Sequence, residues 1–221
     1  METSLSYIGL VVAWAAYLAV HSLLAARRVK AAVARRWPAS ARAYRLIYSL
    51  VAAVTLVPLV ALTVALNGPQ VVAWHGPAWW LAQAAALAAV LGFTTTVRGY
   101  DMGQFLGLGN RSAVTEDGRE SWEPLRLTGL HRFVRHPWYF FGLVILWTRD
   151  LDLAGLVAVL TITVYLVVGS RLEERKLMEA YGDAYAAYRR RVPGLIPIPG
   201  RHLAPDEAGE LARQANEGDP S

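Results

Sequence analysis

Two pairs of ionisable residues in the last third of the chain have the types and spacing for chemistry. Arg135-His136 stands directly before an apolar run, and Glu173-Glu174 follows the end of another, Leu151 to Val168. Ionisable side chains at membrane depth usually face a polar cavity or a partner, and they mark functional sites. A carboxylate there needs a cation, which Arg135 or a bound ligand would supply. The simpler reading is an arginine that reaches the lipid headgroups and two solvated carboxylates at a helix end.

Aromatic residues follow the two carboxylates at helical spacing. Five residues stand three or four positions apart: Glu174, Leu177, Tyr181, Tyr185 and Tyr188. They would share one face of a helix if that helix continues through Gly182. Such a face either lines a binding site or forms an interfacial seam that holds no ligand.

Long apolar segments must position these groups. An α-helix needs about 20 residues to cross a hydrocarbon core of about 30 Å, and three segments have that length: Leu5–Ala26, Leu46–Leu66 and Trp79–Val97. Two further blocks, Trp138–Trp147 and Leu151–Val168, are separated by a short charged turn. No polar stripe runs along the three long segments, so five buried helices of a soluble protein are not favoured. The pattern predicts an all-α integral membrane bundle of about five transmembrane helices, with a short helical hairpin near the C-terminus.

The basic residues predict an orientation. Lys and Arg number 22 against 17 Asp and Glu, for a formal net charge of +5. All but Arg149 fall in loops or tails on one side of the predicted spans, and loops of that kind stay in the cytoplasm. We therefore expect a protein of a bacterial inner membrane with its N-terminus outside and its C-terminus in the cytoplasm. The distribution favours membrane lipids over nucleic acid as the partner of this charge, and it identifies no protein partner.

The domain organisation is simple. Residues 1–199 are expected to form one membrane domain, because the apolar segments and both ionisable pairs lie within it. Residues 200–221 are rich in charged and small residues, and are expected to form a polar, flexible cytosolic tail. The polar loop Asn110–Pro124 is expected to be a mobile cover over a cytosolic opening.

The C-terminal motifs carry a resemblance to a known family. Four of them follow in order: Arg135-His136-Pro137-x-Tyr139, Glu173-Glu174-x-x-Leu177, Tyr181-Gly182-x-x-Tyr185-x-x-Tyr188 and Val192-Pro193. The set, within residues 130–197, resembles the C-terminal signature of the isoprenylcysteine carboxyl methyltransferase superfamily. That superfamily includes phospholipid N-methyltransferases, bacterial thiol S-methyltransferases and NnrU-like proteins. A fainter N-terminal likeness, His21-Ser22 and Tyr44-Arg45-x-x-Tyr48, is nearest to the thiol S-methyltransferase and NnrU-like branches.

The resemblance implies S-adenosylmethionine as cofactor, bound at the cytosolic leaflet. It implies seven cofactor-binding residues: His136, Pro137, Tyr139, Glu173, Glu174, Tyr185 and Tyr188. It also implies that Glu174, His136 and Arg135 are catalytic. These residue types suit the cofactor, because a sulfonium cation is favoured by carboxylates and aromatic faces.

The sequence gives partial information about the methyl acceptor. Prenylcysteine carboxyl methyltransferases carry an arginine at the position of Gly169, and Arg171 points elsewhere because it lies about 200° further around a helix. A small thiol is therefore the expected acceptor, with a lipid amine or a prenylcysteine carboxylate as alternatives. The chain has no cysteine, so such a thiol belongs to the substrate. The same absence excludes a thiolate metal site, and no metal site is expected.

Two other functional classes stay open on sequence grounds. The first is an NnrU-like accessory protein of nitrogen-oxide metabolism that transfers no methyl group. The second is a haem-binding bundle with axial ligands among four histidines: His21, His75, His131 and His136. The haem alternative ranks last because His131 and His136 are five residues apart and would not share a helix face.

Overall fold

The computed structural model describes residues 2–37, 43–97 and 124–217, and its contacts divide the chain into two compact units. Unit 1 comprises the described residues before His75 together with Asp150–Ile162. Unit 2 comprises the described residues of His75–Arg98, Trp122–Arg149 and Thr163–Ser221. The expected cover, Asn110–Pro124, lies outside the described residues except for Pro124.

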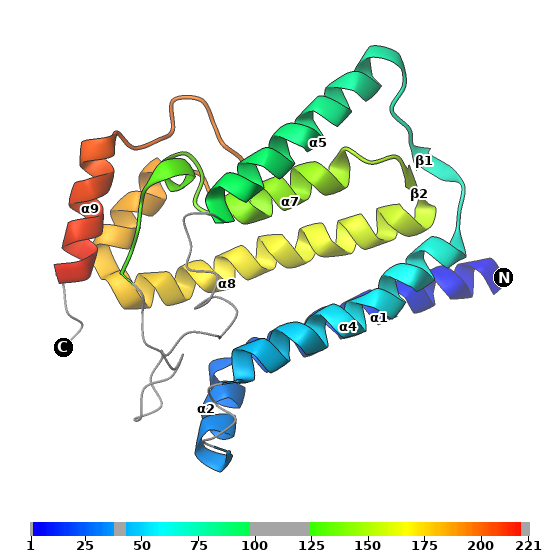
Figure 1. Cartoon of the computed structure of the whole chain (residues 1–221), viewed down its shortest axis with the longest axis horizontal. Helices are drawn as coiled ribbons and strands as arrows, with labels where there is room; N and C mark the ends of the chain where they lie inside the picture. The colour runs from blue at the N-terminus through cyan, green and yellow to red at the C-terminus, as the bar shows by residue number, and fades with distance from the viewer. Residues whose placement is uncertain (1, 38–42, 98–123, 218–221) are drawn as a thin grey trace. The chain divides into compact units, whose positions relative to one another are not determined.

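Unit 1 is built on two long apolar helices (Figure 1). Its elements are α1 (Glu2–Ala25), α2 (Arg27–Arg36), α4 (Tyr44–Leu66), β1 (Gln70–Val72), β2 (Leu151–Asp152) and the first residues of α8 (Leu153–Arg191). Helices α1 and α4 pack through a core that includes Leu10, Trp14 and Leu59. The Tyr44 hydroxyl donates to the Leu24 carbonyl at 2.6 Å, so α4 begins beside the end of α1.

A short antiparallel pair of strands, β1 with β2, leads into α8. Asp152 caps this helix, because its Oδ1 accepts a hydrogen bond from the Gly155 backbone N–H at 2.7 Å. The other carboxylate oxygen accepts from the Gly68 N–H at 3.3 Å. The charged turn between the last two apolar blocks therefore works as a helix start.

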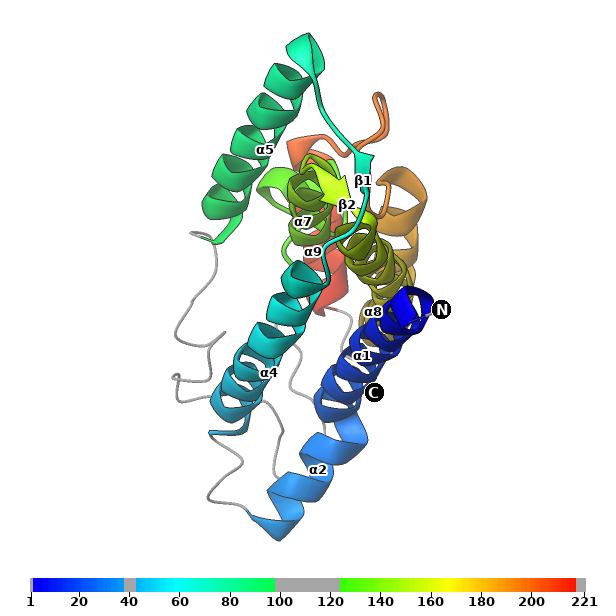
Figure 2. The same ribbon diagram turned by 90° about the vertical axis from the view of Figure 1, so that its right-hand side faces the viewer.

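Unit 2 comprises α5 (Gly76–Val97), the 3₁₀ helix η1 (Gly129–Arg132), α7 (Pro137–Trp147), the remainder of α8 and α9 (Pro205–Glu217). Pro137 occupies the first turn of α7, where its missing N–H removes no intrahelical bond. With 11 residues α7 is about 17 Å long, too short to cross a bilayer upright. Figure 2 shows α7 lying alongside α5.

Four helices are long and apolar enough to cross a membrane, in the parts of the chain that the structure describes. They contain Leu5–Ala25, Leu46–Leu66, Gly76–Thr96 and Leu153–Arg191, and α7 is a shorter apolar helix. These five segments match the five expected from the sequence. The prediction of an all-α integral membrane bundle is confirmed.

Helix α8 is bent within its last third. Gly182 has a φ of 53° and a ψ of −132°, a conformation outside the helical region that glycine adopts at little steric cost. The helix therefore does not continue straight through this residue, which was the condition for a shared face of Glu174 with the tyrosines, and residues 183–191 form a separate helical segment.

The expectation of a flexible tail is wrong for residues 205–217, which form α9. Ala208 and Ala215 are buried, and the cluster around α9 also holds Leu127 and Leu203. This helix was not expected from the sequence because its buried residues are alanines, which carry little hydrophobic bulk. Pro205 followed by two acidic residues in the first turn is the signal that could have revealed it.

Polar contacts also hold α9 in place. The Asn216 side chain accepts from the Leu125 N–H at 2.7 Å and donates to the Leu125 carbonyl at 3.2 Å. Glu207 accepts from the Ala204 N–H and from Arg191. These two contacts hold the pKa of the Glu207 carboxyl below its usual range.

We expect the contact between α5 and α7 to depend on the absence of a side chain at Gly92. A Cβ there would overlap the Phe141 ring, whereas a Cβ at Gly142 meets nothing within 4 Å. Gly92→Ala should destabilise the protein by about 1–3 kcal/mol through overpacking. Gly142→Ala should stabilise it by up to about 1 kcal/mol through helix propensity. Unfolding in mixed micelles measures both changes, and an equal response of the two variants would contradict the proposed close contact.

Candidate active site

The Arg135-His136 pair is held in the short segment between η1 and α7. The Arg135 N–H donates to the Pro193 carbonyl at 2.9 Å, and the His136 N–H donates to the Gly194 carbonyl at 3.0 Å. A Cβ at Gly194 would lie 3.2 Å from the Arg135 guanidinium, so a side chain would crowd this approach. The segment that follows α8 therefore determines where both side chains lie.

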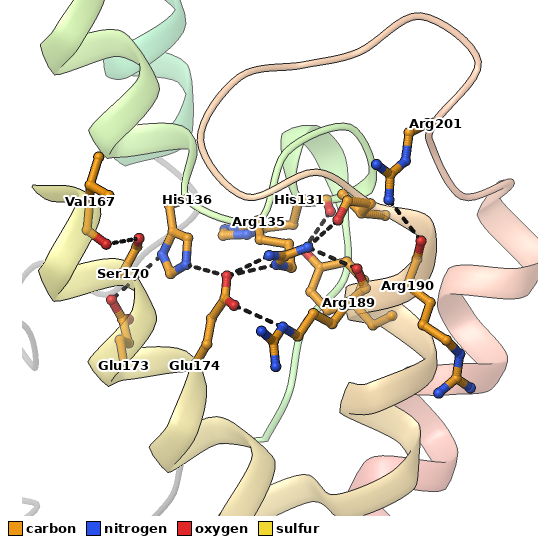
Figure 3. Close-up of polar contacts among 12 residues, drawn as sticks. His131, Arg135, His136, Val167, Ser170, Glu173, Glu174, Arg189, Arg190 and Arg201 are labelled. Atoms are coloured by element: carbon orange, nitrogen blue, oxygen red, sulfur yellow. Dashed lines mark hydrogen bonds and ion pairs between the residues drawn. The ribbon is translucent and has the colours of Figure 1, made fainter.

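Glu174 is the centre of the polar cluster, as Figure 3 shows. Its Oε1 accepts from Arg135 Nε at 2.8 Å, from Arg135 Nη2 at 2.7 Å and from His136 Nε2 at 3.2 Å. Its Oε2 lies 3.1 Å from Arg189 Nε. The Glu174 side chain is 6% exposed, and a carboxylate buried to this degree needs such partners.

Arg135 is fully engaged within the protein. Besides its bonds to Glu174, its Nη1 donates to the Arg189 carbonyl at 2.9 Å and to the Val192 carbonyl. The guanidinium thus joins α7, the middle of α8 and the end of α8. An arginine used in this way has little capacity left for a ligand, which favours a supporting role over substrate contact.

The contact with Glu174 determines the tautomer of His136. An ionised carboxylate only accepts hydrogen bonds, so the proton of the neutral imidazole must be on Nε2. Nδ1 then carries the lone pair, and it lies 3.6 Å from Glu173 Oε2. The ring also stacks on Tyr139, with centroids 5.3 Å apart and planes 9° apart. His136 is therefore oriented with a proton-accepting nitrogen on the side of Glu173.

The exposed part of the cluster carries both signs of charge. The Glu173 side chain is 49% exposed and accepts from the Tyr139 hydroxyl at 3.2 Å. The Arg189 side chain is 53% exposed. A carboxylate, a phenol and a guanidinium thus meet solvent beside the buried His136–Glu174 pair. This arrangement suits a zwitterionic or cationic ligand.

Two predicted cofactor residues, Tyr185 and Tyr188, lie in the core beside this cluster. They are 1% and 2% exposed and pack with Leu127, Leu203 and α9. The Tyr188 hydroxyl donates to the His131 carbonyl at 2.7 Å, in the neighbouring 3₁₀ helix. Neither ring offers a face to solvent in this structure. Pro137 is also buried, as the first residue of α7.

Arg189 belongs to the cluster, although it was not expected from the sequence. In a straight helix, Glu174 and Arg189 are fifteen positions apart and would lie about 22 Å from each other, beyond the reach of an ion pair. The bend at Gly182 returns the end of α8 toward Glu174 and makes the contact possible. The Tyr-Gly motif contained the signal, because the shared helical face was expected only if the helix continued through Gly182.

Comparison with curated proteins finds similar segments in several methanethiol S-methyltransferases. Methanethiol S-methyltransferase 1 of Bradyrhizobium diazoefficiens is 43% identical over 83 residues, which is 36% of this chain and 29% of the relative. The methanethiol S-methyltransferase of Mycobacterium tuberculosis is 42% identical over 74 residues, 33% of this chain and 30% of the relative. That of Pseudomonas deceptionensis is 39% identical over 69 residues, 31% of this chain and 26% of the relative.

The chain resembles thiol S-methyltransferases. This confirms the resemblance drawn from the C-terminal motifs, over about a third of the chain. The matched segments span less than a third of the length of these three relatives. No family model matches the chain, and no solved structure does. The relatives favour methyl transfer over the accessory and haem-binding alternatives.

The histidines also give the haem alternative no support. His136 directs Nε2 at Glu174, and the His21 ring contacts the Tyr48 hydroxyl through Nε2 at 2.6 Å. Among the described residues, no group of three or more acidic or histidine side chains could hold a metal ion.

The two adjacent glutamates should respond differently to the same change. Glu174→Gln leaves the buried Arg135 without its carboxylate, and breaking a buried pair in this way costs about 3–5 kcal/mol. Glu173→Gln alters an exposed carboxylate and should cost less than about 1 kcal/mol. Unfolding in mixed micelles measures both, with Glu173→Gln as the matched control. If Glu174→Gln were as stable as the unchanged protein, the buried ion pairs of Glu174 would not stabilise the structure around the site.

Proposed function

We propose that the protein is an integral membrane methyltransferase that uses S-adenosylmethionine to methylate a small thiol on sulfur. The observation that carries the proposal is the placement of His136 between a buried glutamate and an exposed one. The named activity of the similar methanethiol S-methyltransferases supports it. The acceptor is expected to be a compact thiol of that chemical class.

The exposed groups fit the charges of the cofactor. S-adenosylmethionine carries a sulfonium, an ammonium and a carboxylate. Glu173 would hold one of the cationic groups, Arg189 would hold the carboxylate, and the Tyr139 ring would lie against the sulfonium. The cofactor, when bound, supplies an electrophilic methyl group whose transfer leaves a neutral thioether.

The residues of the chain then have two tasks, positioning and proton transfer. The acceptor sulfur forms a bond to the methyl carbon and loses its own proton. His136 Nδ1 receives this proton, because Nε2 is occupied by its contact with Glu174. Glu174 stabilises the imidazolium that results, and Arg135 holds Glu174 in place. We therefore assign Arg135 and Glu174 to positioning, and His136 to proton transfer.

The surroundings of Gly169 support a small acceptor. Gly169 lies four residues before Glu173 on α8, so the two positions share a helix face. A Cβ at Gly169 meets no atom within 4 Å, which leaves open space on that face. A substrate with a carboxylate, such as a prenylcysteine, would need a cation at this position.

We also propose that the protein lies in a bacterial inner membrane, with the N-terminus outside and the C-terminus in the cytoplasm. A water-soluble charged cofactor would then reach Glu173 and Arg189 from the cytoplasm. Reporter fusions to the two termini test this orientation, and activity of a periplasmic reporter on the C-terminus would contradict it.

The reaction is tested by methyl transfer from deuterium-labelled S-adenosylmethionine in nanodiscs. We expect labelled thioethers from methanethiol or ethanethiol, and no labelled product from primary amines or a prenylcysteine peptide. His136→Gln should lower kcat by about 100-fold or more, since proton transfer by a positioned group contributes about 10²–10⁴ in rate. Cofactor affinity, measured by calorimetry, should fall less than kcat. A protein that binds the cofactor and labels only amines would overturn the proposed acceptor.

Substitutions at Gly169 test the size and charge of the acceptor site. Gly169→Arg should lower the rate with a small neutral thiol by about tenfold or more, because one extra group in a pocket discriminates by about 10–200-fold. Gly169→Ala is the matched control, and should keep the rate because its methyl group enters open space. Equal rates for both variants would show that this face of α8 does not contact the acceptor.

A further inference from the structure

A groove between α1 and α4 in unit 1 is separate in sequence from the candidate active site. It has a volume of about 420 Å³, within the range of about 300–1000 Å³ for ligand pockets. On α1 it extends from Ala13 to Leu24, and on α4 from Tyr48 to Leu62. Both helices are long and apolar enough to span a membrane, so acyl chains surround them there.

The walls of the groove present apolar surface. Its polar side chains bond within the protein: His21 contacts Tyr48 at 2.6 Å, and the Tyr17 hydroxyl donates to the Ala52 carbonyl at 3.2 Å. The Thr55 hydroxyl donates to the Val51 carbonyl at 2.6 Å. An occupant therefore gains mainly by burying hydrocarbon rather than by forming hydrogen bonds.

The length and position of the groove fit one leaflet of a bilayer. The residues from Ala13 to Leu24 span about 17 Å of helix, close to half of a hydrocarbon core of about 30 Å. The groove ends at Leu24, one residue before α1 ends and three before α2 begins. It therefore occupies the leaflet nearest to α2.

Helix α2 supplies positive charge at that end. Its ten residues, Arg27–Arg36, include five Lys or Arg and no acidic residue. Arg28, Arg35 and Arg36 are exposed, and the Arg36 guanidinium lies 5.8 Å from the centroid of the exposed Trp37 ring. Clustered Lys and Arg beside a membrane span attract anionic headgroups, and tryptophan prefers the membrane interface.

We propose that this groove binds one acyl chain of an anionic phospholipid whose headgroup lies against α2. The apolar walls, the length of a single leaflet and the basic helix at one end all match this amphiphile. The bound chain would fill the space between α1 and α4 and hold α2 at the membrane surface. This site does not depend on the proposed methyl transfer.

Photo-crosslinking tests the proposal on the intact protein in nanodiscs. The probe is phosphatidylglycerol with a diazirine in one acyl chain, and phosphatidylcholine with the same chain is the comparison. We expect mass spectrometry to locate the label on the groove-lining parts of α1 and α4, with more label from phosphatidylglycerol. No label on these residues would overturn the proposal, because it would mean that protein covers the groove. Equal labelling by both lipids would also overturn it.

Two pairs of variants separate the groove from general lipid contact. Ala16→Phe fills the groove and should remove most of the label, whereas Val12→Phe adds the same bulk at an exposed position outside its lining. Arg28→Gln with Arg35→Gln should lower the preference for phosphatidylglycerol by about fivefold per charge, from about 1 kcal/mol for each. Arg171→Gln with Arg175→Gln removes equal exposed charge elsewhere. The proposal is overturned if Ala16→Phe and Val12→Phe lower the labelling equally. It is also overturned if the two double arginine variants lower the preference for phosphatidylglycerol equally.

Discussion

A single buried carboxylate, that of Glu174, constrains the structure around the site. Its charge would be strongly unfavourable at this burial without partners, so two guanidinium groups and an imidazole must reach it together. The partners come from two local structures: the short segment before α7 supplies Arg135 and His136, and the last part of α8 supplies Arg189. The bend at Gly182 and the backbone contacts of the Pro193–Gly194 segment both serve this convergence.

Adjacent positions on one helix explain why the two glutamates differ. Consecutive residues of an α-helix point about 100° apart, so a helix at the edge of a core turns one side chain inward and the next outward. Glu174 points inward to the cations, and Glu173 stays half exposed beside Tyr139 and His136. The inner carboxylate is committed to structure and to orienting the imidazole. The outer carboxylate remains available to a cationic ligand.

The sequence predicted the parts of the fold that depend on local composition. The length and hydropathy of the apolar segments located α1, α4 and α5, and Pro137 predicted the start of α7. The convergence of Arg135, His136, Tyr139, Glu173 and Glu174 was also expected, because the two ionisable pairs border two neighbouring apolar blocks. These features follow from patterns that are read along the chain.

The features that were not predicted depend on contacts between distant segments. Arg189 joins Glu174 because Gly182 adopts a positive φ, which local sequence permits but does not require. Tyr185 and Tyr188 would share a face with Glu174 only in a helix continuous through Gly182, and in the bent helix α9 and Leu127 cover them. A buried face of alanines gave α9 too weak a hydrophobic signal to suggest this cover.

The basic residues of the chain serve two different purposes. Some bond to carbonyl or carboxylate groups in unit 2: Arg132, Arg135 and Arg191. Others are exposed on α2: Arg28, Arg35 and Arg36. A count of basic residues therefore overstates the charge available to interact with the membrane.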